Sequence, residues 1–313
     1  MNLLRVLDLD ASSFAAALDD AGASKAEPSR RRGALAHETL VGVFASPSTR
    51  TRLAFATAAH RLGLLPFFVD PEGLQLDRGE DIADTARSLS SYAALIVARL
   101  PSHEDVEALA AAATVPVVNL LSDRHHPCEA LASLFTLREH FGELDGLRLA
   151  YVGDGSNVAH SLIEAAALAG ANINVASPAG HEVDEAVVAE ARRAASAAGG
   201  EVVVGDDPVA AVRGAHAVLT DRWVSMGDEA AAADRRRFAR YQVNEQLIAL
   251  ADRDAVFIHC LPARRGEEVT AEVLDGPRSL VWEQVANHVY VAEAVIWAMA
   301  RARRVGVSLP ERE

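Results

Sequence analysis

The chain has 313 residues, of which 50% are apolar and 24% charged, and its formal net charge is −14 at pH 7. This length suits two domains of ordinary size, and the apolar fraction is typical of a folded, soluble protein and excludes a disordered one. The acidic balance argues against nucleic acid as a partner, so an anionic ligand would need a local basic pocket.

In the first half of the chain, short apolar segments alternate with segments whose apolar residues recur at helical spacing. After a polar start over residues 1–38, we predict strands at 40–45, 65–69, 93–98 and 115–119. Helices are predicted between them, near 50–62, 80–91 and 103–112. A long amphipathic helix over 127–142 then leads to the second half of the chain.

The second half repeats this alternation. Strands are predicted at 148–153, 173–177, 201–204, 216–220 and 255–260, with helices near 157–169, 184–198, 206–213 and 244–251. Strands that are apolar almost throughout and alternate with helices indicate parallel sheets covered on both faces. We therefore predict an α/β protein with two doubly wound parallel-sheet domains, 1–142 and 143–283. A last helix over 284–304 is expected to pack back on the first domain and complete it.

The cysteines and the apolar segments indicate the cellular setting. Cys128 and Cys260 are the two cysteines, and nothing in their positions indicates a secreted disulfide scaffold. The first 14 residues carry charges throughout and lack the apolar region of a signal peptide. The longest apolar stretch, 108–121, is too short to span a membrane. We expect a cytoplasmic protein without a membrane partner.

Polar residues that could carry chemistry follow directly after predicted strands. They are Arg99, the HHPCE segment at 125–129, the GDGSN turn at 153–157, the segment 221–229, and HCLP at 259–262. Ligands of open α/β sheets bind beyond the carboxyl ends of the strands. The same edge of each predicted sheet is therefore the expected place for a site.

The segment STRTR over 48–52 lies between a predicted strand and a predicted helix. Free N–H groups at the start of a helix suit a phosphate, and Arg50 and Arg52 could add charge-assisted hydrogen bonds. The segment has no glycine-rich cradle and no Lys-Ser/Thr pair, so it is not a nucleotide P-loop. Taken alone, it is more typical of the start of a capped helix with solvated arginines.

Two other patterns invite a cofactor or a metal. The turn at 153–157 resembles part of a dinucleotide fingerprint, but Val158 replaces the third glycine and the next strand ends in Ser177 without an acidic residue. A NAD-dependent dehydrogenase is thus a distant alternative. Neither the histidines nor the cysteines have the spacing of metal ligands, so no metal is expected. His259 and Cys260 are adjacent on a strand and should point to opposite faces.

The motifs together resemble one family. STRTR, a strand-terminal Arg, HPC followed by a polar residue, GDGxN, DxWxSMG over 221–227 and HCLPA over 259–263 occur in this order in transcarbamylases. The last two are similar to the ornithine branch of the aspartate/ornithine transcarbamylase family. The resemblance covers about residues 40 to 300. It implies transfer of a carbamoyl group from carbamoyl phosphate to the side-chain amine of L-ornithine, giving citrulline and phosphate in arginine biosynthesis. It also implies a homotrimer that needs no cofactor.

The resemblance implies roles for residues at matching positions. Ser48, Thr49, Arg50 and Thr51 resemble the phosphate-binding helix start of the carbamoyl-phosphate site. Arg99 and His126 resemble the groups that hold and polarise the carbamoyl oxygen, and Gln75 resembles the residue offered across a trimer interface. Asn157, Asp221, Ser225 and Met226 match residues that hold the α-amino and α-carboxylate groups of ornithine, and Cys260 and Leu261 match residues beside its reacting amine. The catalytic candidates are Arg99, His126, Asp221 and Cys260.

Three positions on the donor side depart from the family pattern. Ser46 stands where the family usually has Lys, Glu129 where it has Gln, and His288 where it has Arg. All three changes make the donor site less positive. A carboxylate at 129 could still accept from the carbamoyl NH₂, or it could form an ion pair with Arg50 or Arg99.

Two alternatives to the ornithine enzyme stay open at this point. One is a specialised transcarbamylase with another donor or another amine acceptor. The other is a catalytically silent paralogue that binds an amino acid or assembles with a true transcarbamylase. The intact DxWxSMG segment favours ornithine over putrescine, which has no α-carboxylate to be held.

Overall fold

A computed structural model describes residues 1–70, 73–223 and 236–306. Within these residues the chain forms two compact units, one made of residues 1–128 and the described residues after 286, and the other of 129–286. The first unit carries a four-stranded sheet and the second a five-stranded sheet, and all pairings in both sheets are parallel. The predicted fold class, two parallel-sheet α/β domains, is confirmed.

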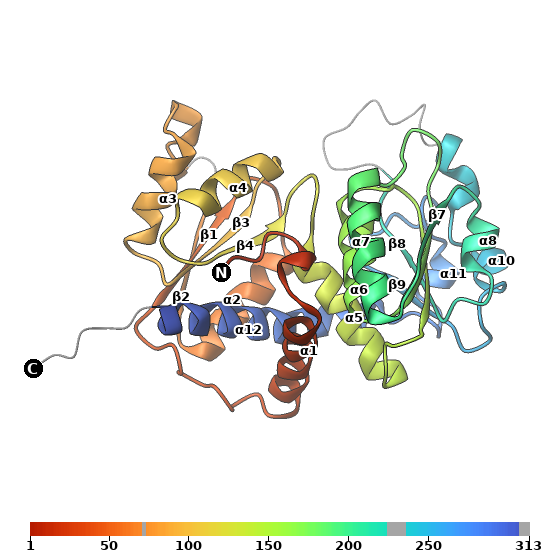
Figure 1. Cartoon of the computed structure of the whole chain (residues 1–313), viewed down its shortest axis with the longest axis horizontal. Helices are drawn as coiled ribbons and strands as arrows, with labels where there is room; N and C mark the ends of the chain where they lie inside the picture. The colour runs from red at the N-terminus through yellow and green to blue at the C-terminus, as the bar shows by residue number, and fades with distance from the viewer. Residues whose placement is uncertain (71–72, 224–235, 307–313) are drawn as a thin grey trace, which may run out of the picture. The chain divides into compact units, whose positions relative to one another are not determined.

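The first sheet has the strand order β2-β1-β3-β4. Its strands are β1 (Thr39–Phe44), β2 (Leu65–Val69), β3 (Leu95–Arg99) and β4 (Val117–Leu121). Its helices are α1 (Ala11–Ala26), α2 (Arg50–Leu62), α3 (Ile82–Ser90), α4 (His103–Ala112) and most of α12 (Val281–Gly306). Short 3-10 turns cover Val6–Asp8 and Leu76–Arg78. Figure 1 shows α3 and α4 on one side of this sheet and α2 and α12 on the other.

The layers follow from the alternation of side chains along the strands. Val41 and Val43 face the same way as Ile96 on the neighbouring strand, and they form a core with Val106 and Leu109 of α4. The opposite face is also apolar, with Leu40 fully buried. This continuous burial explains why the strand segments are apolar almost throughout.

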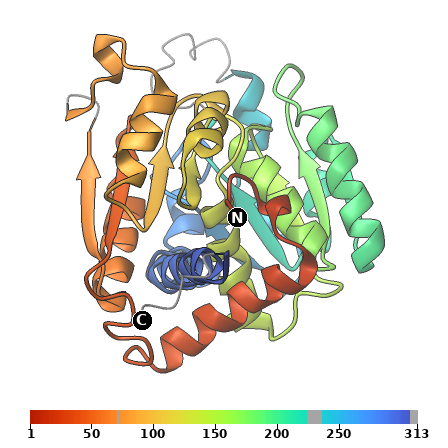
Figure 2. The same cartoon turned by 60° about the vertical axis from the view of Figure 1, so that its left-hand side comes forward.

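Helix α12 packs on the first unit, as the sequence predicted (Figure 2). Asn287 accepts a hydrogen bond of 2.8 Å from the Nζ of Lys25 on α1, and Arg303 pairs with Glu38. Helix α1 was not predicted. It buries Phe14, Leu18, Ala21 and Ser24 along one face and begins at Asp10, whose side chain accepts from the Ser13 N–H.

The second sheet has the strand order β7-β6-β5-β8-β9. Its strands are β5 (Arg148–Val152), β6 (Asn172–Ala176), β7 (Val202–Gly205), β8 (Ala217–Thr220) and β9 (Val256–His259). Helices α6 (Asn157–Leu168) and α7 (Glu185–Ala198) lie on one side in Figure 1. Helices α8 (Pro208–Val212), α10 (Glu245–Ile248) and α11 (Ala271–Leu274) pack into the core of the other side. A 3-10 turn covers Ala239–Tyr241.

Two helices run from one compact unit into the other. The units change between Cys128 and Glu129, inside α5 (Pro127–Phe141), and between Ala286 and Asn287, inside α12. The sequence analysis placed the domain boundary at 142–143, at the end of the helix it predicted there. Among the described helices, none is both long and apolar enough to cross a membrane.

Candidate functional site

The carboxyl ends of β1, β3 and β4 carry the predicted donor residues of the first unit. Phe44 pairs with Arg99 in the register of β1 and β3, and Arg99 pairs with Leu121 of β4 after a shift in register. The chain segments that follow these paired residues therefore leave the sheet at the same edge. They contain Ser48–Arg50 after β1 and His126 after β4.

The segment 48–51 forms the predicted helix start. Thr49 is the N-cap of α2 and Arg50 is its first residue, and the cap side chain makes no hydrogen bond to the helix. Thr51 is buried, while Ser48 and Arg50 are partly exposed. Because the first N–H groups of a helix have no partner inside the helix, this end can bind an anion.

Arg50 and Arg52 have different surroundings. The guanidinium of Arg52 forms an ion pair with Asp70 and lies over the ring of Phe44, 4.6 Å from its centroid. Arg50 instead lies close enough to His288 for its charge to lower the pKa of that imidazole. Of the two arginines in the motif, Arg50 is thus the one directed toward the other donor-side residues.

His126 and His288 are both buried and neutral near pH 7. Burial, then the charge of Arg99 and, when it is protonated, that of His288, hold the pKa of His126 well below its usual value. Burial, and then the charge of Arg50, lowers the pKa of His288 to about 4. The structure thus brings Arg50, Arg99, His126 and His288 together, with the charge supplied by the two arginines.

The remaining predicted donor-side residues lie in different surroundings. Gln75 is exposed, and its amide oxygen accepts from Arg78 at 3.1 Å. Glu129 is buried in the second unit, where its Oε1 accepts a 2.6 Å hydrogen bond from Nε2 of Gln284. The same Nε2 also donates to Ser133 Oγ at 2.9 Å. Sequence reasoning missed Gln284, because nothing local connects it to a residue 155 positions away.

The carboxyl ends of β5, β8 and β9 carry the predicted acceptor residues of the second unit. Thr220, the last residue of β8, pairs with His259, the last residue of β9. Asp221 and Cys260, the residues that follow this pair, are therefore neighbours. The Cys260 thiol donates to Asp221 Oδ1 at 2.9 Å. Asn157 is the first residue of α6, after the 153–156 turn that follows β5. Ser225 and Met226 lie outside the described residues.

A buried pair beneath Cys260 was not found from the sequence. The Leu261 N–H donates to His259 Nδ1 at 2.8 Å, so this nitrogen accepts and Nε2 carries the proton, 3.2 Å from Glu268 Oε1. Both side chains are about 1% exposed. As the strand geometry predicted, His259 does not pair with the Cys260 thiol. The hydrogen bond to His259 holds the backbone of Leu261, whose φ of 56° is unusual for a residue other than glycine.

One group of described residues has ligand atoms close enough to hold a metal. Candidate atoms of Asp221, His259 and Cys260 lie within 4.8 Å of one another. Their hydrogen bonds argue against an open site, because the thiol donates to Asp221 and the His259 nitrogens face Leu261 and Glu268. A metal would have to displace these bonds. In the part of the chain that the structure describes, this group is therefore not a dedicated metal site.

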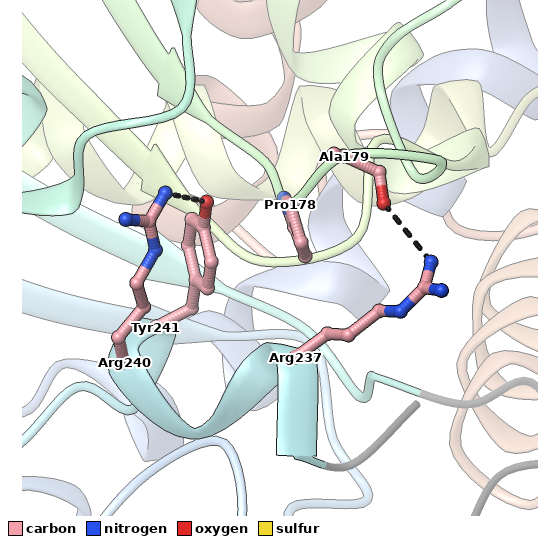
Figure 3. Close-up of a pocket in the computed structure, with 5 residues that line it drawn as sticks. All are labelled: Pro178, Ala179, Arg237, Arg240 and Tyr241. Carbon is pink, nitrogen blue, oxygen red and sulfur yellow. Dashed lines mark hydrogen bonds between the residues drawn. The ribbon is translucent and has the colours of Figure 1, made fainter. Parts of the chain in front are cut away.

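A cavity in this unit contains none of the predicted residues. Figure 3 shows a cavity of about 360 Å³ lined by Pro178, Ala179, Arg237, Arg240 and Tyr241. Arg237 donates to the Ala179 carbonyl, and Arg240 donates to the Tyr241 hydroxyl. The cavity lies beyond the ends of β6 and β7, because Pro178 follows β6 and the Tyr241 hydroxyl donates to the carbonyl of Asp206, after β7.

The two sheets and the residues at their carboxyl edges define a two-domain α/β protein with a basic site in one domain and an acidic, thiol-containing site in the other. Residues 1–139 match the family profile "Aspartate/ornithine carbamoyltransferase, carbamoyl-P binding domain", and residues 145–299 match its "Asp/Orn binding domain". The chain therefore belongs to the aspartate/ornithine carbamoyltransferase family, a family of transferases.

Individual relatives agree with this family. The chain is 51% identical over 290 residues to an ornithine carbamoyltransferase of Acidothermus cellulolyticus, covering 92% of this chain and 93% of that one. Its structure is similar to that of ornithine carbamoyltransferase from Pyrococcus furiosus, with a TM-score of 0.92 and 45% identity over 95% of this chain and 96% of that one. A mutant N-acetyl-L-ornithine transcarbamylase is also similar, with a TM-score of 0.86, 27% identity, and 96% and 99% coverage.

Proposed function

We propose that this protein transfers the carbamoyl group of carbamoyl phosphate to the side-chain amine of L-ornithine, giving citrulline and phosphate. The observation that carries the proposal is the 51% identity to an ornithine carbamoyltransferase over nearly the whole of both chains. The motifs DRWVSMG and HCLPA, which resemble the ornithine branch, are intact in this sequence.

The first domain, residues 1–142 with 284–304, is the proposed donor-binding part. Ser48, Thr49, Arg50 and Thr51 hold the phosphate at the start of α2, where free N–H groups and the helix dipole favour an anion. Arg99 and His126 hold the carbamoyl oxygen. Because the pKa of His126 is low, its neutral imidazole acts as a hydrogen-bond donor and not as an acid.

The second domain, residues 143–283, is the proposed acceptor-binding part. Asn157 and Asp221, with Ser225 and Met226, hold the α-amino and α-carboxylate groups of ornithine. Cys260 and Leu261 lie beside the reacting amine. The Asp221 carboxylate, to which the Cys260 thiol donates, supplies a negative group for a cationic amino acid.

The reaction needs two bound reactants and donors for a developing oxyanion. The unprotonated amine attacks the carbamoyl carbon, a C–N bond forms, and the carbonyl oxygen gains negative charge. Arg99, His126 and Thr51 stabilise this oxygen. The C–O bond to phosphate then breaks, and phosphate leaves with the electron pair and takes up the proton that the new amide nitrogen loses. Holding the two reactants in attack geometry supplies the proximity contribution.

The donor-side departures favour a second candidate, a transcarbamylase with a weakened or altered donor site. His288 is buried with a pKa of about 4, so it does not replace the charge of an arginine. Glu129 accepts from Gln284, which supports a structural role for its carboxylate. A family member named for N-acetyl-L-ornithine is an example of a different acceptor within the family.

The assembly we propose is a homotrimer. Leu65 and Phe67 on the edge strand β2 are 63% and 57% exposed, and Leu53 on α2 is 61% exposed. Exposed apolar side chains on an edge strand favour association with another chain. Gln75 is exposed in the same unit, which supports a role for its side chain in a neighbouring copy. We place the protein in the cytoplasm, where its two free cysteines stay reduced.

A citrulline-forming assay tests the function. Purified protein is given high carbamoyl phosphate with ornithine, N-acetylornithine, lysine or putrescine in parallel. We expect carbamoylation of ornithine, with the other amines far slower. Carbamoylation of none of these amines, together with norvaline binding, would support the silent paralogue. Faster carbamoylation of another amine would replace ornithine as the acceptor.

A further inference from the structure

Two hydroxyl groups lie at the carboxyl edge of the second sheet, behind the predicted acceptor residues. Tyr151 on β5 is fully buried, and its hydroxyl donates to the carbonyl oxygen of Asp154 at 2.9 Å. Thr220 at the end of β8 is 2% exposed, and its hydroxyl donates to the carbonyl oxygen of Val152. β5 and β8 are neighbouring strands, so both hydroxyls lie at one strand junction.

Gly153 lies between these hydroxyls. A Cβ on this residue would stand 3.2 Å from Thr220 Oγ1, 3.7 Å from the Tyr151 hydroxyl and 3.8 Å from the carbonyl oxygen of Asp221. Its φ of 148° also disfavours a side chain. The two hydroxyls and the backbone of Asp221 therefore surround the residue that begins the 153–156 turn.

Burial and the surrounding charges keep the Tyr151 hydroxyl protonated. Burial raises the pKa of Tyr151 well above its usual value, and Asp221, Asp154, Cys260 and Glu268 raise it further. The phenol is thus a permanent donor beside the acidic groups of this domain. Its proton is directed at the Asp154 carbonyl, inside the turn that leads to Asn157.

We propose that Tyr151 and Thr220 are positioning residues for the amino-acid substrate, which hold the turn before Asn157 in fixed geometry against Asp221. Tyr151 fixes the turn after β5, and Thr220 connects the end of β8 to β5. Neither side chain touches the substrate in this proposal. The positioning role rests on the proposed acceptor roles of Asn157 and Asp221, because the two hydroxyls would fix the distance between these residues.

The chain contains a matched control. Tyr241 is also fully buried in the same unit, and its hydroxyl donates to the carbonyl oxygen of Asp206 at 2.7 Å. It lines the cavity of Figure 3, which contains neither Asn157 nor Asp221. Tyr241→Phe removes the same kind of hydrogen bond, together with the one that Arg240 donates to this hydroxyl, and reports the structural cost of losing a buried phenol hydroxyl away from the acceptor residues.

The experiment compares Tyr151→Phe, Thr220→Val, Thr220→Ser and Tyr241→Phe in the full-length protein. Norvaline, which has the backbone groups of ornithine without the reacting amine, is titrated by calorimetry, and citrulline formation gives KM for each substrate. We expect Tyr151→Phe and Thr220→Val to weaken norvaline binding and raise the ornithine KM about tenfold, equivalent to about 1.4 kcal/mol. The KM for carbamoyl phosphate should stay unchanged. Thr220→Ser keeps a hydroxyl and should resemble the native protein, as should Tyr241→Phe.

Two results would overturn the proposal. The first is a norvaline affinity of Tyr151→Phe equal to that of Tyr241→Phe. The second is a joint rise of the KM values for both substrates, which would mean a general structural effect. Asp221→Asn separates this failure from failure of the proposed function. If Asp221→Asn weakens norvaline binding and Tyr151→Phe does not, the acceptor site stands and the positioning role is wrong. If Asp221→Asn has no effect, the acceptor assignment itself is wrong, and this proposal with it.

Discussion

Arg50 and Arg52 are two positions apart on α2, yet only one of them is available to an anion at the helix start. Arg52 is held by Asp70 and by the face of Phe44. Arg50 begins the helix and acts electrostatically on His288. Arg52 therefore contributes to packing and a local ion pair, whereas Arg50 contributes positive charge at the helix start.

Arg50→Ala should weaken binding of phosphate and carbamoyl phosphate. A lost hydrogen bond to a charged group costs about 1.5–3 kcal/mol, which corresponds to roughly a ten- to hundredfold loss of affinity. Calorimetric titration with each anion measures the change. Arg52→Ala is the matched control, because it removes the same charge from the same helix and should leave anion affinity close to native. Equal losses in the two variants would contradict the assignment of Arg50.

Restoring the family residues should strengthen the donor site. Ser46→Lys, Glu129→Gln and His288→Arg each make the charge more positive, and His288 carries no charge near pH 7 that its replacement would lose. We expect the triple variant to bind carbamoyl phosphate at least about tenfold more tightly. The gain should shrink at high ionic strength, since it is partly Coulombic. Tight binding by the native protein and no gain in the variant would show that other residues have replaced these contacts.

Among the strands, β2 exposes apolar side chains to solvent in the single chain. Leu65 and Phe67 alternate with residues that are more buried, and Phe68 packs edge-on against Phe44. β2 is also at the edge of its sheet. An edge strand with apolar side chains can extend its contacts to another copy.

Phe67→Asp should therefore dissociate the proposed trimer. A charge on this edge opposes burial in an interface, whereas the fold should tolerate it because the side chain is 57% exposed. Light scattering coupled to size-exclusion chromatography measures the mass. Tyr92→Asp changes another exposed aromatic residue of the same unit, 78% exposed at the end of α3, and should leave the mass unchanged. A native protein that is already monomeric would contradict the proposal.

At the scale of the whole molecule, burial of histidines makes stability depend on pH. The pKa of His288 is about 4 in the folded chain and about 6.5 when unfolded, so the unfolded state binds a proton first as the pH falls. The stabilisation of the folded state is present above about pH 6.5 and is lost between about 6.5 and 4. Between pH 7.5 and pH 5 this single group accounts for about 2 kcal/mol.

His288→Asn should reduce this acid sensitivity. Denaturant midpoints at pH 7.5 and pH 5 measure the loss of stability in the native protein and in the variant. The native protein should lose more than the variant, because asparagine does not take up a proton. His60→Asn, on the same unit and exposed, is the control and should retain the native pH dependence. If His288→Asn loses as much stability between pH 7.5 and pH 5 as the native protein does, groups other than His288 cause the acid sensitivity.

The positions of the strands and most helices can be predicted from the sequence, because apolar periodicity is a local property of the chain. The strand predicted at 65–69 and the helices predicted at 50–62 and 103–112 have the bounds of β2, α2 and α4. It also placed the motifs at the carboxyl edges of the sheets, since every polar cluster followed a strand. Helix α1 was missed because its buried face holds only four residues, two of them small.

Which side chains meet, and which of them are charged, depends on the folded chain and could not be predicted from the sequence. Cys260 reaches Asp221 because the register of β8 and β9 pairs Thr220 with His259. Glu129 meets Gln284 from 155 residues away, and burial makes His288 neutral. Strand register, long-range contacts and desolvation depend on residues that are distant in the chain. The local patterns that predict a helix or strand therefore do not predict these three properties.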